Sequence, residues 1–519
     1  MLPQKLQPVA IQERIQTIDI IRGFALFGIL IINFTVDAGM TEPWAGFTGF
    51  IDQLVYWPIA FFMNDKFVAI YCFLFGLGFS IQMLRAKENN SPFVFVYLRR
   101  LIVLYIIGAI HQILTRGDIV GDYAMAGVLL LILHWLPRKL LPVLAVLCFL
   151  VPWTRQLING MNQKTMSNQR TINVDPNLLD KYVGVYKIEN GNIHVITRKA
   201  DSLLGDGPAR HYELIPKTEN VFKRADMNAT YTFLKDSTGK VNEVLMEGPA
   251  TAHGRRIDMN VEEMLKKQQQ QQKAVVNNRP QETRSYKKFV IGNAQAFWNK
   301  LKNWSWKNYF WGFSIKGILP LFLMGLYFGR RKVFYNIAEN RLFLKNVMKW
   351  GLIIGMTSFA IALGFDAWNY FNGIKDESYS LLTRHFLYAA WDFLGVMGMA
   401  LGYVAGMALL LDKADWKKRL SFLGPIGRMG LTNYLIQAII ISVTIDSYGF
   451  NLNGKAGPAW RLLMALVTFA FIIFLSRWWF KRFRIGPAEW LWRSLTYLKF
   501  QPMRLKSSDK AEEKEKEKN

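Results

Sequence analysis

The sequence is poor in cysteine, histidine and acidic residues. It holds two cysteines, six histidines and 38 acidic residues against 64 lysines and arginines. Both cysteines, Cys72 and Cys148, fall inside apolar stretches, so no structural disulfide is predicted. The N-terminus lacks the small-residue cleavage site of a secretory signal, so we expect the first apolar stretch to be retained. The net charge is +26, but much of the basic excess lies in loops and linkers and forms no separate stretch of mixed basic and aromatic residues. This distribution argues against nucleic acid as a partner.

Apolar residues are abundant instead: 51% of the 519 residues are hydrophobic and 14% are aromatic. Long apolar runs in such a composition predict an all-α polytopic membrane protein, with the lipid bilayer as its surroundings. About ten runs are long enough to cross a bilayer. They lie near 18–36, 66–84, 98–115, 119–136, 139–153, 308–329, 347–368, 386–411, 431–447 and 459–480. The stretch Phe50 to Met63 is too short to cross and predicts an interfacial or re-entrant piece.

The charged residues between these runs predict the orientation of the chain. Every second connection is basic, as at 85–100, 138–139, 330–332, 413–419 and 481–484. The alternate connections carry Asp37, Glu42, Asp52, Asp118, Asp122, Asp376 and Glu377. Because basic loops stay on the cytoplasmic side, both termini are predicted to be cytoplasmic and residues 154–307 to lie outside a bacterial cytoplasmic membrane.

The segment 154–307 separates two membrane halves, 1–153 and 308–500, with five predicted spans each. Within 154–259, short alternating stretches such as VGVYKI and TYTFL predict a small antiparallel β-domain. Residues 260–307 indicate a helical, Gln-rich linker that ends in an aromatic segment suited to the membrane interface. The charged tail at 501–519 is predicted to be disordered.

Three strongly polar side chains interrupt the first predicted span. Asp19 and Arg22 are three residues apart and can neutralise each other on one helix face. Asn33 returns to the face of Arg22 about three turns later. Such groups are costly in a bilayer, by about 2.5–3.5 kcal/mol for a charge, so they predict either an interfacial ion pair with a packing amide or a polar seam that lines a site.

Several separated motifs resemble one family. DIIRGFALFGILIIN (19–33), LFGLGFS (74–80) and RRLIVLYIIGAIHQILTRGDIVGDYA (99–124) are similar to the N-terminal half of the YeiB-like membrane proteins. GRMGLTNYLIQ (427–437) and FRIGPAEWLWRSLTY (483–497) resemble the domain of unknown function number 418 that defines that family. LDKYVGVYKIENGNIHV (179–195) resembles the small β-barrel module number 3471 that follows serine β-lactamase-like enzymes. That module brings no Ser-x-x-Lys motif, which suggests binding or spacing as its role.

The first resemblance implies membership of a wider group of transmembrane acyltransferases. It includes the heparan glucosaminide acetyltransferases and the acyltransferase type-3 enzymes. The implied reaction moves an acyl group from a cytoplasmic thioester, acyl-CoA as co-substrate and no metal, to an extracytoplasmic glycan or lipid acceptor. Type-3 enzymes carry a His near the outer end of the first span, and here that position is Asn33. No His occupies residues 38–65, where the glucosaminide acetyltransferases place theirs.

His111 is therefore the candidate general base. It lies eleven residues after Arg100 and seven before Asp118, so the three would share one face if the helix continued unbroken. Asp118 or Asp122 would orient the imidazole and raise its basicity. The alternative is a buried His that donates one hydrogen bond to a neighbouring helix. A second constellation is His385 with Asp392.

A donor with phosphates needs cations at the cytoplasmic face. Asp19, Arg22, Arg100 and Arg428 are the candidate donor-binding residues, although the basic loops explain each arginine equally well. Arg22 and Arg428 stand beside glycines that allow close approach. Asn433 and Gln437 add a polar stripe that favours helix association over substrate contact.

Two other classes of function remain open. Five spans on each side of the insert give the halves opposite orientation, as in inverted-repeat transporters, but the second half has no echo of DIIRG. A sensor whose external β-domain reports a ligand to the bundle is the third class, and the Gln-rich linker argues against stiff coupling.

Overall fold

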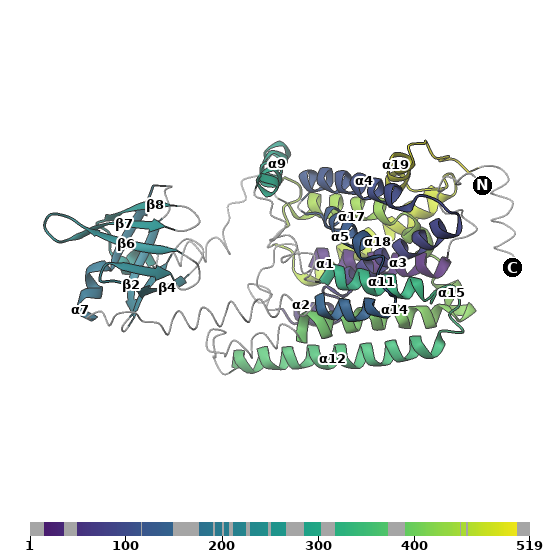
Figure 1. Cartoon of the computed structure of the whole chain (residues 1–519), viewed down its shortest axis with the longest axis horizontal. Coiled ribbons are helices and arrows are strands. Elements are labelled where there is room, and N and C mark those ends of the chain that lie inside the picture. Colours follow the sequence, from purple (N-terminus) through teal and green to yellow (C-terminus); the bar gives the residue numbers. More distant parts are fainter. Residues whose placement is uncertain are drawn as a thin grey trace. The chain divides into compact units, whose positions relative to one another are not determined.

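The computed structural model contains two compact units, residues 1–154 with 282–519 and residues 155–281 (Figure 1). We call them the helical unit and the barrel. The structure describes residues 15–35, 49–115, 117–148, 176–189, 193–199, 202–206, 211–224, 229–247, 251–265, 285–302, 317–371, 390–446, 448–452 and 455–505. His385, the glutamine run at 268–272, the tail beyond 505 and parts of the predicted spans at 139–153 and 308–329 lie outside these residues.

The first part of the helical unit contains α1 (Gln16–Thr35), α2 (Phe50–Phe62), α3 (Lys66–Glu88), α4 (Phe93–Leu114) and α5 (Val120–Leu133). After the insert come α9 (Tyr286–Lys302), α11 (Leu319–Arg330), α12 (Arg341–Phe371), a π-helical segment (Ala390–Met397), α14 (Gly398–Leu411) and α15 (Ala414–Arg419). The last helices are α16 (Leu423–Arg428), α17 (Gly430–Ile445), α18 (Pro458–Phe480) and α19 (Pro487–Tyr497). Helices thus lie on most of the predicted spans.

Five helical stretches in the described residues are long and apolar enough to cross a membrane. They are Gln16–Thr35, Phe50–Glu88, Phe93–Leu114, Leu394–Leu411 and Pro458–Phe480. The helices Val120–Leu133, Leu319–Arg330 and Gly430–Ile445 are apolar but shorter. The prediction of a mostly helical membrane protein is therefore supported, whereas this criterion identifies five spans and not ten.

Helix α1 is the central helix of this unit, and most of its side chains are buried. It packs against α16 so closely that only glycine fits at two contact points. A Cβ atom on Gly23 would lie 2.2 Å from the carbonyl oxygen of Leu423, and one on Gly427 would lie 1.9 Å from that of Asp19. The glycines beside Arg22 and Arg428 therefore bring the two arginine-bearing segments together.

Helix α4 has one apolar exposed face and one buried face. Exposed side chains recur at helical spacing: Phe95, Leu98, Ile102, Ile106 and Ile110. The buried residues lie between them: Tyr97, Leu101, Leu104, Gly108 and His111. This pattern is typical of a helix with one lipid-facing side, and it turns His111 toward the interior of the unit.

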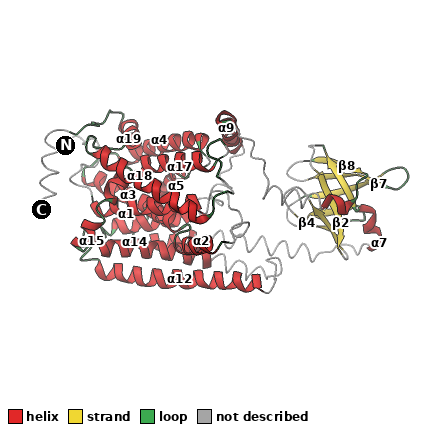
Figure 2. Cartoon of the chain, turned by 180° about the vertical axis from the view of Figure 1, so that it is seen from behind, coloured by secondary structure: helices red, strands yellow, loops and turns green. Residues whose placement is uncertain are grey.

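The barrel is a closed antiparallel sheet of eight strands in sequential order (Figure 2). The strands are β1 (Gly184–Ile188), β2 (Ile193–Lys199), β3 (Ser202–Asp206), β4 (His211–Pro216), β5 (Val221–Arg224), β6 (Thr230–Lys235), β7 (Val241–Glu247) and β8 (Ala252–Ile257). Each strand pairs with the next, and β1 closes the ring on β8, with Val185 opposite Ile257. The predicted small antiparallel β-domain is present, and its last strand is β8.

Aromatic rings fill the barrel. Tyr182, Tyr186, Phe222 and Phe233 are almost fully buried, and the ring of Phe233 lies 4.8 Å from that of Tyr182 and 5.5 Å from that of Phe222. Along β6, buried Tyr231 and Phe233 alternate with less buried residues, which is the period-two pattern of a sheet with one solvent-facing side.

Candidate active site

A cavity of about 660 Å³ runs through the helical unit. Residues of α1, α3, α4, α5, α16, α17 and α19 line it, together with the connection between α4 and α5. Six of the seven residues that the sequence singled out are on its wall: Asp19, Arg22, Asn33, Arg100, Asp118 and Arg428. Asp19 and Asn33 are fourteen residues apart on α1, so the cavity extends along that helix for about 20 Å.

The lining residues sort by charge along this length. Near the start of α1 and of α4, the wall carries five arginines, which we call the basic end: Arg22, Arg85, Arg100, Arg428 and Arg493. Asp19 and Glu489 are the carboxylates at this end. Toward the ends of α1, α4 and α17 the wall carries the acidic end: Asn33, Thr115, Asp118, Ser442 and Asp446. The basic end can hold an anion, and the acidic end favours a neutral or cationic group.

Neighbouring side chains hold the arginines of the basic end. Arg22 Nη1 donates to Asp19 Oδ1 at 3.2 Å, which is the contact that the spacing of these residues predicts. The guanidinium of Arg100 stacks on the ring of Trp492 at 3.8 Å, and that of Arg428 lies 4.1 Å from the ring of Phe480. Stacked guanidinium groups keep their edges for bidentate contact with phosphate or carboxylate.

Glu489 was missed in the sequence, and it organises the start of α17. Its carboxylate accepts hydrogen bonds from the backbone N–H of Leu431 at 2.6 Å and of Thr432 at 3.1 Å. The hydroxyl of Thr432 donates to its other oxygen at 2.6 Å. A carboxylate at a helix N-terminus satisfies orphan donors and complements the helix dipole. The available signal in the sequence was the position of Glu489 in the first turn of α19, which begins at Pro487 directly after Gly486.

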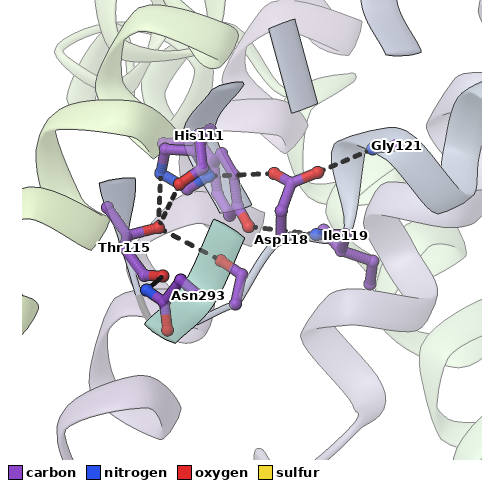
Figure 3. Close-up of polar contacts among 8 residues, drawn as sticks. His111, Thr115, Asp118, Ile119, Gly121 and Asn293 are labelled. Atoms are coloured by element: carbon purple, nitrogen blue, oxygen red, sulfur yellow. Dashed lines mark hydrogen bonds and ion pairs between the residues drawn. The ribbon is translucent and has the colours of Figure 1, made fainter. Parts of the chain in front are cut away.

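At the acidic end, His111 and Asp118 form a buried pair (Figure 3). The imidazole Nδ1 lies 3.0 Å from Asp118 Oδ1, and Asp118 Oδ2 accepts from the backbone N–H of Gly121 at 2.7 Å. The expectation of an unbroken helix through Asp118 is wrong: α4 ends at Leu114, and Asp118 reaches back from the connection to α5. Asp122 lies instead 4.0 Å from Lys300.

This pairing fixes which nitrogen of His111 can act as a base. An ionised Asp118 accepts the proton on Nδ1, so Nε2 of the neutral ring keeps its lone pair. Nε2 lies 3.4 Å from the hydroxyl of Thr115 (Figure 3). Thr115 lines the cavity, whereas His111 does not. Thr115 is therefore the cavity-lining residue whose hydroxyl contacts Nε2, and the sequence did not single it out.

Helix α9 holds the end of α4 in place. The Asn293 side chain donates to the carbonyl oxygens of Thr115 at 2.9 Å and of Ile113 at 3.2 Å, and the Tyr286 hydroxyl donates to that of Leu114 at 3.2 Å. These bonds satisfy carbonyls that the last turn of a helix leaves open. The segment between the barrel and the second half thus supports the backbone that carries Thr115.

Two further groups complete the acidic end. The hydroxyl of Tyr434 accepts from the backbone N–H of Ile119 at 3.4 Å, and its ring lies 5.5 Å from that of His111. Among the described residues, no acceptor is found for the proton of that hydroxyl. Ser442 donates to Asp446 at 2.5 Å and accepts from Tyr448 at 2.7 Å. Ordinary polar residues at the end of a predicted span gave no signal for this cluster.

The amides of α17 fasten helices together, as their spacing suggested. Asn433 donates to the carbonyl oxygen of Ile426 and to the Ser476 hydroxyl, each at 3.0 Å. Gln437 donates to the carbonyl oxygen of Leu26 at 3.4 Å. Neither lines the cavity. In the part of the chain that the structure describes, no group of three or more His, Cys, Asp or Glu side chains is arranged to hold a metal.

Comparison with known proteins finds one matching family model and several similar bacterial proteins. Residues 328–499 match the family described as protein of unknown function (DUF418). The chain is 25% identical to the uncharacterized protein YxaH of Bacillus subtilis (strain 168) over 97% of this chain and 99% of that protein. Identity to the uncharacterized protein YeiB of Escherichia coli (strain K12) is 37%, over 14% of this chain and 18% of YeiB.

An uncharacterized 39.9 kDa protein in the amylase 3' region of Bacillus acidopullulyticus is 35% identical over 24% of this chain and 36% of its own length. No solved structure matches the chain. The names of these relatives state no reaction, so they support a family and leave the chemistry to the site. The chain is thus similar to DUF418 proteins over residues 328–499, and to YxaH along nearly its whole length.

Proposed function

We propose that this protein is a membrane-embedded acyltransferase that moves an acyl group from a cytoplasmic thioester donor to an extracytoplasmic glycan or lipid acceptor. One observation carries the proposal: a single cavity joins five arginines to Asp118, the carboxylate that holds the buried imidazole of His111. A buried charge without a task is costly in a membrane, and here the buried polar groups of separate helices meet along one passage.

The basic end suits the phosphates of acyl-CoA. Arg22, Arg100 and Arg428 come from three different segments and line the same space, so they can contact an anion from several sides. Asp19 and Trp492 orient two of these guanidinium groups before a ligand arrives. The narrow thioester arm of the donor would extend along α1 toward Asn33.

The acidic end suits the chemistry of transfer. His111 would act as the general base through Nε2, with Asp118 holding the ring and stabilising its protonated form. The hydroxyl of Tyr434 is a candidate donor to the oxyanion that forms at the thioester carbonyl. Asn33 and Ser442 line the space that an acceptor hydroxyl would occupy.

The topology that this reaction needs is part of the proposal. Ten spans, cytoplasmic termini and an extracytoplasmic segment at 154–307 put the basic end at the cytoplasmic face of the bacterial cytoplasmic membrane. The alternation of basic and acidic connections supports this orientation. The same topology leaves the barrel outside the membrane and the tail at 501–519 in the cytoplasm.

Transport is the alternative function. Helices from both halves, α1 and α4 from the first and α17 and α19 from the second, line the cavity, as they would at the binding site of a carrier. Acyl transfer is favoured because five arginines at one end suit a phosphate-bearing donor and the imidazole at the other has the carboxylate partner of a general base.

The test uses purified full-length protein in detergent or in vesicles. Unlabelled CoA thioesters of increasing chain length are first screened for thermal stabilisation, which is about 2.7 kcal/mol at a hundredfold excess over Kd. Release of free CoA and labelling of lipid or glycan acceptors are then measured for the wild type and for His111→Ala. We expect His111→Ala to lower turnover by about 10²- to 10⁴-fold while donor stabilisation persists.

His134→Ala is the matched control, because His134 is also buried in the helical unit but its imidazole contacts, within the described part of the chain, the carbonyl oxygen of Leu131 and not a carboxylate. Its turnover should stay close to that of the wild type. Undiminished turnover in His111→Ala would remove His111 as the base. Uptake of a thioester into vesicles without release of free CoA would instead support transport.

A further inference from the structure

Thr115 contacts His111 and also lines the cavity. It follows the last residue of α4, and its side chain is 3% exposed. Its hydroxyl oxygen lies 3.4 Å from His111 Nε2 on one side, while the residue lines the cavity on the other.

We propose that Thr115 is the nucleophile that first takes the acyl group, so that Asp118, His111 and Thr115 work as a nucleophilic triad. The inference rests on the proposed acyltransferase function and deepens it, because it makes the reaction a two-step transfer through a threonine ester. The triad geometry carries the argument: carboxylate to imidazole at 3.0 Å, and imidazole to hydroxyl at 3.4 Å.

The first step forms the bond between Thr115 Oγ1 and the thioester carbonyl carbon. Thr115 gives its proton to His111 Nε2, the carbon–sulfur bond breaks, and the proton on Nε2 passes to the departing sulfur to give free CoA. In the second step an acceptor hydroxyl gives its proton to Nε2 and its oxygen bonds to the same carbon. The ester bond to Thr115 then breaks, and Oγ1 regains the proton.

The surroundings of Thr115 favour this role. Its hydroxyl donates to the carbonyl oxygen of His111 at 2.8 Å, so rotation of the O–H bond toward Nε2 is the main adjustment that proton transfer requires. Catalytic hydrogen bonds are commonly longer before substrate binds, and 3.4 Å lies in that range. Asn293 fixes the Thr115 backbone from α9, and Asp118 fixes the imidazole.

A purely structural threonine makes a different prediction. Back-bonding to the carbonyl four residues earlier is common for threonine in helices, and a valine of equal shape would replace it at small cost. Serine keeps the hydroxyl and loses only a methyl group. Thr115→Ser and Thr115→Val therefore separate a chemical role from a packing role.

The experiment incubates full-length wild type, Thr115→Ser and Thr115→Val with radiolabelled acetyl-, octanoyl- and palmitoyl-CoA in the absence of acceptor. Label is located by mass spectrometry on the tryptic peptide 101–116, which contains both His111 and Thr115. We expect an ester on Thr115 in the wild type, an ester on the serine variant, and no label with at least 100-fold slower CoA release in Thr115→Val.

Label on His111, or CoA release by Thr115→Val within tenfold of the wild type, would overturn the inference and leave the proposed function standing. A wild type that releases no CoA from any of the three thioesters would overturn the proposed function and this inference with it. Labelling of the wild type needs no variant, so it decides the matter even where Thr115→Val fails to fold.

Discussion

The helical unit and the barrel both bury an apolar core, but they differ in where polar and exposed apolar side chains lie. In the helical unit, polar groups such as Asp19, His111 and Asn433 are buried, while large apolar side chains of α4 and α18 are exposed. In the barrel, the rings of Tyr186 and Phe233 are inside. Because lipid accepts exposed apolar groups and penalises exposed charge, the helical unit is built for a bilayer and the barrel for water.

The same contrast separates the tasks of the two units. The helical unit leaves a cavity of about 660 Å³ among its polar groups, and those groups are available to a ligand. The barrel uses its interior for packed rings, so its interior contributes mainly to stability. The proposed chemistry therefore uses the helical unit, and binding or spacing is the role that we propose for the outer surface of the barrel.

The largest expected effect tests the filled barrel. Phe233→Ala removes a fully buried ring that contacts the rings of Tyr182, Tyr186 and Phe222. The lost transfer free energy and the new void should lower the free energy of unfolding of the barrel by about 3–5 kcal/mol. Hydrogen exchange of barrel peptides in the full-length protein measures this change, while peptides of the helical unit should keep their protection.

Leu234→Ala is the control, because Leu234 is the next residue on β6 and its side chain is 39% exposed. It should change exchange of the barrel only slightly. If Phe233→Ala accelerated exchange equally in both units, the barrel and the helical unit would unfold together, and the division of the chain into two independent units would be wrong.

A smaller loss of stability is expected where hydrogen bonds of Glu489 at the wall of the cavity are removed. Glu489→Leu removes the acceptor for Leu431 N–H, Thr432 N–H and the Thr432 hydroxyl. Unsatisfied buried donors should lower the free energy of unfolding by about 1–3 kcal/mol, because water in the cavity can replace part of what is lost. Thermal unfolding and exchange of the first turn of α17 measure the effect.

Asp415→Asn serves as its control, since Asp415 is an exposed carboxylate in the same unit. It should leave both measurements unchanged. Faster exchange in α17 that also appears in Asp415→Asn would mean that net charge, and not the hydrogen bonds of Glu489, governs this region.

Much of the helical unit follows from the sequence, because lipid imposes simple rules. Apolar length predicted the positions of α1, α3, α4 and α18, and the cost of buried charge predicted that Asp19 and Arg22 would contact each other. The number of spans did not follow in the same way, since α5, α11 and α17 are shorter than a bilayer requires by length alone. In the barrel, alternating apolar and polar residues and turn residues predicted the strands. The pairing of β1 with β8, which closes the sheet into a barrel, did not follow from the sequence.

The site was predictable where residue type is rare and not where it is common. His111 was easy to single out because the chain has only six histidines. In the structure it lies on the buried face of α4. The role of Asp118 depends on where α4 ends, which helical spacing does not fix. Thr115 and Tyr434 are residues of ordinary kind, and only the packing of α17 and α9 against α4 brings them to the cavity.

The smallest expected effect concerns a polar group inside the barrel. His194 Nδ1 lies 2.8 Å from the Tyr212 hydroxyl, which in turn accepts from Tyr231 at 3.0 Å. Burial, and then the positive charge of Arg224, lower the pKa of His194 below its usual value. The unfolded chain therefore binds the proton more readily, and the barrel should keep its full stability above about pH 6.5 and lose part of it as the pH falls toward the lowered pKa.

Exchange of barrel peptides, corrected for intrinsic rates, measures this loss between about pH 7.5 and about pH 5.5. Side-chain hydrogen bonds lower the pKa of Glu219 and of Asp236. Those two carboxylates therefore titrate below this pH range. His194→Gln should flatten the pH dependence, whereas His253→Gln should keep it because His253 is exposed on β8. A pH dependence that survives in His194→Gln would assign it to another group, and the barrel would then depend on pH through its surface and not through its interior.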